Sequence, residues 1–177
     1  MRACVSSLVM AILVVVAPVR AEVVEQSDGH FAVSNTVTVS VESGRAFRAI
    51  TAEVGQWWDP VHTFFGSAEA LLFEPRVGGC FCERLQDGRG VEHLRVVYTE
   101  PGRMIRLTGA IGPLQGLAIT GVATWTLSET ASGTTIEMSY SVAGHRTGGL
   151  GELAAPVDAV LAEQLARLKA YLDSVPR

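Results

Sequence analysis

The strongest constraint on the fold is a series of short segments in which apolar and polar residues alternate, separated by dipeptides that favour turns. In residues 36–41 every second residue is a valine, which is typical of a strand with one buried face. Links such as Asp87-Gly88 and Ser132-Gly133 are short enough to join antiparallel neighbours. The sequence predicts seven strands in one antiparallel sheet, at residues 36–41, 68–74, 79–85, 91–99, 104–109, 117–128 and 134–143.

After residue 150 the apolar residues recur every three or four positions, which predicts a long amphipathic helix. The residues with this spacing are Leu153, Val157, Leu161, Leu165, Leu168 and Leu172. Pro156 should either kink this helix or mark its start after a first turn. Two short helices are expected after the first strand, one capped by Ser43 and one ending at Asp59-Pro60. The fold class is therefore α+β, with a bent sheet around a C-terminal helix and a hollow between them.

The first 21 residues have the features of a secretory signal. Met1-Arg2 is basic, residues 8–17 are apolar, and Ala21 is a suitable cleavage residue. The apolar run is about a dozen residues, whereas a spanning helix needs about 20. We therefore predict cleavage after Ala21, a flexible leader at 22–30 and a single domain at 31–174. The mature protein is expected to be periplasmic or secreted, without stable membrane insertion.

Charge and motifs exclude several classes of partner. The chain carries 18 acidic and 14 basic residues, a formal net charge of −4, and has no basic cluster for a phosphate backbone. Nucleic acid is therefore not an expected partner, and no metal or cofactor is predicted. Hydrolase, metalloprotease and phosphate-loop motifs are absent from the sequence, which favours a binding protein over an enzyme. The oligomeric state is left open.

Several sequence stretches resemble the SRPBCC superfamily, which includes START domains, birch-pollen-allergen-like proteins and polyketide cyclases. They are Gly78-Gly79-x-Phe81-x-Glu83, residues 96–101, residues 123–127 and residues 165–172. The stretch Trp57-Trp58-Asp59-Pro60 is similar to a bacterial branch close to the activators of the heat-shock ATPase. The resemblance implies a helix-grip fold with an internal pocket for an apolar or amphipathic molecule. It implies no particular reaction.

The segment Cys80-Phe81-Cys82-Glu83 raises the question of which side chains face the interior. Residues two apart on a strand are about 6.6 Å apart, and a disulfide needs Cβ atoms about 3.8 Å apart, so the two thiols should not bridge each other. Phe81 is the larger apolar group and should face inward with Glu83, which leaves the thiols outside or at an edge. The hairpin through residues 86–89 should then place Phe81 and Glu83 beside Leu94 and Val96.

Since the side chains of a strand alternate between its two faces, His93 should lie on the opposite face, together with Cys80 and Cys82. A structural zinc site needs four ligands and no fourth is visible, so a metal is not predicted there. An intermolecular disulfide remains open for these thiols.

Ten residues are predicted to line a ligand pocket: Trp58, His62, Phe81, Glu83, Leu94, Val96, Trp125, Tyr140, Leu161 and Leu165. Glu83 would hydrogen-bond the ligand or take up a proton, or it would pair with an arginine at the rim or reach water at the end of its strand. His62 would lie at the mouth or cap a turn, and Tyr140 would point into the hollow or bond to backbone. The apolar connection 110–116 is expected to cover the cavity.

Two functions follow from this arrangement. The first is an exported binding protein that encloses a small hydrophobic or amphipathic molecule between the sheet and the C-terminal helix. The alternative is an enzyme of polyketide cyclase or dehydratase type, with Glu83 or His62 as the general base.

Overall fold

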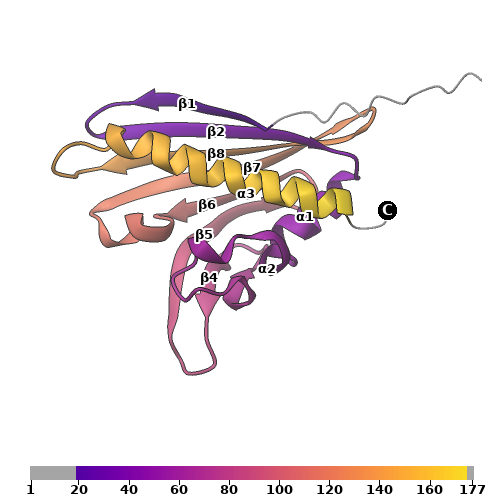
Figure 1. The fold of residues 1–177 in the computed structure, drawn as a ribbon, viewed down its shortest axis with the longest axis horizontal. Helices are drawn as coiled ribbons and strands as arrows, with labels where there is room; N and C mark the ends of the chain where they lie inside the picture. The colour runs from indigo at the N-terminus through magenta and orange to yellow at the C-terminus, as the bar shows by residue number, and fades with distance from the viewer. Residues whose placement is uncertain (1–18, 175–177) are drawn as a thin grey trace, which may run out of the picture.

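The computed structural model describes residues 19–174 and shows one bent antiparallel sheet with a long helix along its concave side (Figure 1). The strand order is β1-β2-β8-β7-β6-β5-β4-β3. The strands are β1 (Arg20–Gln26), β2 (His30–Val39), β3 (Leu71–Phe73), β4 (Cys80–Arg84), β5 (Gly90–Glu100), β6 (Met104–Gly109), β7 (Ile119–Thr130) and β8 (Gly133–Gly144). The α-helices are α1 (Ser43–Thr51), α2 (Val54–Trp57) and α3 (Ala154–Ser174), and short 3-10 turns are η1 (Pro60–His62), η2 (Ala68–Ala70), η3 (Gly112–Gly116) and η4 (Gly151–Leu153).

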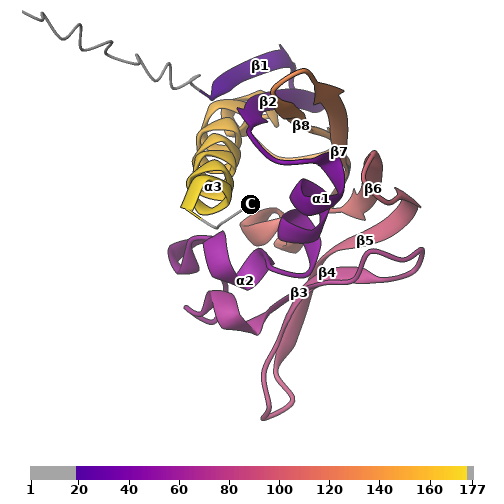
Figure 2. The same ribbon diagram turned by 90° about the vertical axis from the view of Figure 1, so that its right-hand side faces the viewer.

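The core lies between the concave face of the sheet and the helices. Along β2 and β8 alternate residues are buried, as the period of a strand requires. The leucines of α3 at 161, 165, 168 and 172 are buried against this face. Figure 2 shows the sheet curving so that α3 and α2 lie on its inner side, and Figure 1 shows α1 near the C-terminal end of α3. The α+β class and the long C-terminal helix are confirmed.

Within residues 19–174 the sheet has eight strands, so the prediction of seven is wrong. The additional strand, β1, is an edge strand that pairs with β2 and occupies most of the stretch expected to be a flexible leader. It was missed because it is largely polar and almost entirely exposed, with Val23 alone partly buried. The predicted cleavage point after Ala21 falls within β1, and residues 1–18 of the predicted signal lie outside the described residues.

Pro156 lies in the first turn of α3, which begins at Ala154 after the turn η4. A proline at this position removes no intrahelical hydrogen bond, because the first amide groups of a helix have no carbonyl partner within it. Of the two outcomes expected for Pro156, the structure shows the second: the helix starts anew after a first turn and is not kinked at the proline. None of the helices within residues 19–174 is long and apolar enough to cross a membrane.

The pairing of β4 with β5 corrects the predicted orientation of His93. Phe81 pairs with Leu94 as predicted, but Cys82 then pairs with Glu92, so His93 is an extra residue on β5. Such a bulge changes the face on which the following residues lie. His93 and Leu94 are therefore both buried, and Glu83 pairs with Val91 rather than lying beside Val96. His93 faces the interior with Glu83, and the prediction that it faces outward with the cysteines is wrong.

Cys80 and Cys82 form a disulfide with each other, against expectation. Their Cα atoms are 5.5 Å apart, shorter than the repeat of about 6.6 Å in a regular strand, so β4 is contracted locally. Both residues are buried rather than exposed. The alternative of an intermolecular disulfide therefore does not apply in this structure.

Candidate functional site

A pocket of about 530 Å³ lies beneath the N-terminal half of α3. Its walls come from the helix, from the segment that follows α2 and from the connection between β6 and β7. Val61 and Phe64 are 74% and 51% exposed, which marks the mouth. The lining residues are Trp58, Val61, His62, Thr63, Phe64, Phe81, His93, Ile111, Gly112, Pro113, Leu114, Leu153, Pro156, Val157, Val160 and Leu161.

The walls are almost entirely apolar. Within residues 19–174, no Asp, Glu, Lys or Arg lines the pocket, and the titratable residues on its walls are His62 and His93. Transfer of an ionised group into such surroundings without a partner is strongly unfavourable. The pocket therefore suits an uncharged molecule with a mainly apolar surface.

Glu83 does not line the pocket but holds one of its walls in place. Its side chain is fully buried, and Oε1 accepts a hydrogen bond from the Phe64 amide (2.8 Å) and pairs with His93 Nε2 (2.9 Å). Oε2 accepts from the Phe65 amide at 3.1 Å. Three donors thus compensate a carboxylate that has lost its water. Within residues 19–174, Glu83 is not a lining residue of the pocket and no arginine pairs with it. Its full burial also contradicts the alternative in which it reaches water at the end of the strand.

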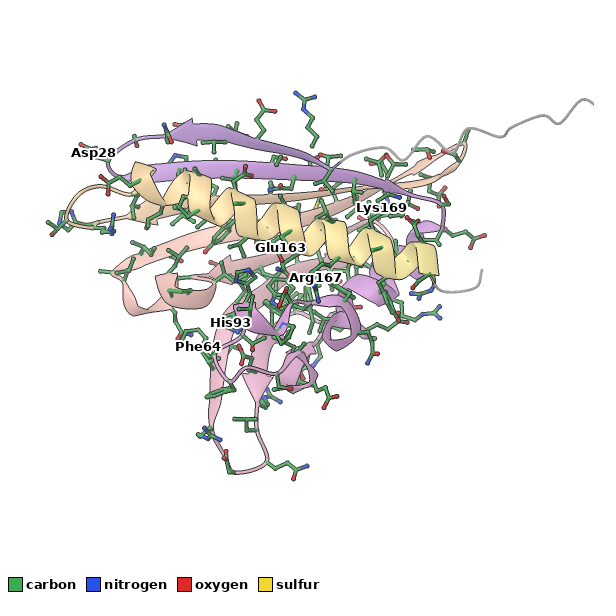
Figure 3. All side chains as sticks on the ribbon, in the orientation of Figure 1. Asp28, Phe64, His93, Glu163, Arg167 and Lys169 are labelled. Atoms are coloured by element: carbon green, nitrogen blue, oxygen red, sulfur yellow. A yellow bond between two sulfur atoms is a disulfide. The ribbon has the colours of Figure 1, made fainter. Side chains whose placement is uncertain are left out.

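His93 lies between two aromatic rings at the pocket wall. Its ring centroid is 5.7 Å from that of Phe64 and 5.3 Å from that of Phe81, and Figure 3 shows His93 and Phe64 together below α3. Burial lowers the pKa of His93, and the neighbouring Glu83 opposes this only in part. The ring is then neutral near pH 7, with the proton on Nε2 donated to Glu83. Nδ1 remains as a lone-pair acceptor and has no partner among the described residues.

Tyr140 holds the opposite wall. Its buried hydroxyl accepts a hydrogen bond from the Ile111 amide (3.1 Å) and donates one to the Gly109 carbonyl (3.2 Å). Burial raises the pKa of Tyr140 to about 12, so the phenol keeps its proton. Of the two roles expected for Tyr140, the structure shows the hydrogen bonds to the backbone. These bonds fix the segment 111–114 beside the pocket.

The segment 60–65 is fixed to α3 by polar contacts that the sequence did not reveal. Gln164 accepts a hydrogen bond from the Asp59 amide (2.8 Å), and Arg167 pairs with the Asp59 carboxylate (3.1 Å). Asp59 itself caps the turn by accepting from the Val61 amide, the role considered for His62. His62 instead lies on the pocket wall with Nε2 3.5 Å from Glu163.

The structure divides the ten predicted pocket residues into two groups. Trp58, His62, Phe81 and Leu161 line the pocket. The other six are buried without lining it: Glu83, Leu94, Val96, Trp125, Tyr140 and Leu165. Leu94 and Trp125 surround only a small void of about 10 Å³, because Trp57, Trp58 and Trp125 fill the centre of the expected hollow. His93 was missed as a pocket residue because no pattern in the sequence indicates the bulge that turns it inward.

Comparison with known proteins identifies the fold. No family model and no curated protein sequence matches the chain. Similar solved structures include a protein from Rhizobium leguminosarum (17% identity, 90% of this chain and 100% of that one, TM-score 0.62) and MLL2253 from Mesorhizobium loti (20%, 82% and 99%, 0.58).

Two further neighbours are DynU16, from the dynemicin biosynthetic locus, and CalU16 from Micromonospora echinospora. DynU16 is 22% identical over 81% of this chain and 47% of its own, with a TM-score of 0.59. CalU16 is 17% identical over 84% and 78%, with a TM-score of 0.51. At these identities the likeness concerns the fold, a large antiparallel sheet with a C-terminal helix.

Glu83→Gln should lower the free energy of unfolding by about 2–4 kcal/mol, because an amide cannot accept all three hydrogen bonds and leaves buried donors unpaired. Urea unfolding measures the effect. The matched control is Glu92→Gln, which removes an exposed pair with Arg95 and should cost about 1 kcal/mol or less. Equal losses in the two variants would contradict the anchoring role of Glu83.

The stability of the protein should fall as the pH drops below about 6.5, the ordinary pKa of histidine. Because the pKa of His93 is lowered in the folded state, the unfolded chain binds a proton in this range before the folded protein does. Urea unfolding between about pH 7 and pH 5 should show a smaller slope of stability against pH for His93→Phe than for the wild type. Parallel curves would show that His93 titrates normally.

Proposed function

We propose that this chain is a binding protein that encloses a small, uncharged apolar or amphipathic molecule between the sheet and α3. The observation that carries the proposal is the pocket of about 530 Å³ with apolar walls and no charged lining residue within residues 19–174. This volume is in the range of about 300–1,000 Å³ that is usual for small-molecule sites. Desolvation of the ligand would supply most of the affinity.

Membership of the SRPBCC superfamily, with its helix-grip arrangement, is part of this proposal. It is supported by the position of α3 on the concave side of the sheet and by the likeness in fold to DynU16 and CalU16. DynU16 is a protein of the dynemicin biosynthetic locus, which is consistent with a fold that handles organic molecules of moderate size.

Export to the periplasm or the medium is a further part of the proposal. It is supported by the apolar segment at residues 8–17 and by the Cys80–Cys82 disulfide, because disulfides persist mainly in oxidising compartments. Cleavage after Ala21 would remove two residues of β1 and keep the strand from Glu22 onward. N-terminal sequencing of protein recovered from the host's periplasm should therefore begin at Glu22.

Pyrene tests the pocket directly, since it is an apolar fluorescent hydrocarbon without hydrogen-bonding groups. It should bind to the wild type, with the change in vibronic band ratio that reports an apolar environment. Val160→Trp should weaken binding by at least about tenfold, equal to about 1.4 kcal/mol, because the indole would occupy the pocket beneath α3.

The control is Val122→Trp, which adds the same ring at an exposed position of β7 outside the pocket. Its affinity for pyrene should equal that of the wild type. If pyrene does not bind, or if both tryptophan variants bind it equally well, the proposed site is wrong.

One observation favours catalysis as a second candidate function. A neutral imidazole whose Nε2 is held by a buried carboxylate is the arrangement of a general base, and His93 has it at the pocket wall. Glu83 would then orient His93 rather than act as the base itself. A cyclase or dehydratase should convert a synthetic poly-β-keto thioester into a product lighter by one water, detected by mass spectrometry, and His93→Phe should be inactive. No product from the wild type would exclude this reaction for that substrate class.

A further inference from the structure

One polar side-chain atom of a residue on the pocket wall is buried and has no hydrogen-bond partner among the described residues. Within residues 19–174, His93 Nδ1 is the one buried side-chain N or O atom on the pocket wall that lacks a partner. The other polar side chains on the wall each make at least one polar contact. Trp58 Nε1 donates to the His62 carbonyl, Thr63 Oγ1 donates to the Pro60 carbonyl, and His62 Nε2 lies near Glu163. A buried polar group without a partner is rare in native proteins and points to a missing one.

Glu83, the partner of the other ring nitrogen, determines whether Nδ1 of His93 is a donor or an acceptor. Glu83 already accepts two backbone hydrogen bonds and can act only as an acceptor, so the imidazole places its proton on Nε2, toward Glu83. Nδ1 is consequently a lone pair. An ether or ketone oxygen would present a second lone pair to it, and a carboxylate or phosphate would find no cation among the described lining residues.

We propose that the ligand is an uncharged molecule with an apolar body and one O–H or N–H group, such as a phenol or an alcohol, which donates a hydrogen bond to Nδ1 of His93. This inference rests on the pocket-binding function proposed above and names the chemical class of its ligand. His93 would set specificity by rejecting isosteres that lack a donor, because a buried site without its polar partner loses affinity.

The two rings beside His93 explain how a ligand reaches it. Phe81 is buried and forms a fixed support, whereas Phe64 is 51% exposed and lies in the mouth segment. Rotation of an exposed side chain takes place in picoseconds to nanoseconds. Nδ1 is buried in this structure, and movement of the Phe64 ring from its place beside the imidazole would open a path to it, while the Phe64 amide remains bonded to Glu83.

Displacement of bound pyrene by two matched naphthalenes tests the inference. In the wild type, 2-naphthol should bind about fivefold to tenfold more tightly than 2-methoxynaphthalene, the gain expected from one hydrogen bond. His93→Phe keeps an aromatic ring between Phe64 and Phe81 but has no acceptor, so the two compounds should bind to it equally. His145→Phe, at an exposed histidine outside the pocket, should keep the wild-type preference.

The outcomes separate this inference from the function on which it rests. If pyrene fails to bind, the proposed function fails and the inference falls with it. If pyrene binds but the two naphthalenes bind equally to the wild type, or if the preference survives in His93→Phe, only the inference is overturned.

A measurement on the wild type covers the case in which His93→Phe does not fold. In nitrogen-15 NMR, the Nδ1 resonance of His93 should shift when 2-naphthol is added and stay in place with 2-methoxynaphthalene. A resonance that both compounds leave unchanged would overturn the inference.

Discussion

The arrangement of the pocket depends on a buried negative charge. Glu83 is fully enclosed, so its carboxylate is stable only where donors replace water. Two of these donors are the consecutive backbone amides of Phe64 and Phe65, in the segment 60–65 at the pocket mouth. The third is the ring of His93 on the adjacent strand. Since these three donors must converge on one carboxylate, the segment 60–65 and β5 have fixed positions relative to β4. The bulge at His93 places this third donor on the buried face of the sheet, beside Glu83.

The opposite wall is held in a comparable way by a neutral group. The hydroxyl of Tyr140 bridges the Gly109 carbonyl and the Ile111 amide, at the point where β6 leads into the segment 111–114. Gln164 and Arg167 fix the third side by connecting α3 to Asp59. Each wall is therefore joined to a neighbouring element by polar contacts behind the apolar lining. For the proposed ligand binding, such preorganisation would reduce the ordering cost, so that more of the desolvation energy would contribute to affinity.

The sequence predicts those features that arise from a local period. The alternation of valines in β2, the turn residues and the leucine spacing of α3 each follow from the geometry of a single element. It does not predict β1, because an exposed edge strand buries too little to need an apolar pattern. It also does not predict the face of His93, because a bulge depends on two strands together. This one-residue shift brings His93, which is not among the ten predicted pocket residues, to the pocket wall.

The position of α3 in chain order has a consequence for how the cavity comes into existence. Every strand of the described sheet precedes α3 in the chain, so the whole sheet is synthesised before the helix that covers the pocket. Until α3 docks, the apolar concave face and the aromatic cluster of Trp57, Trp58 and Trp125 are open to the surroundings. The pocket therefore exists only once the last element of the chain has packed against the sheet.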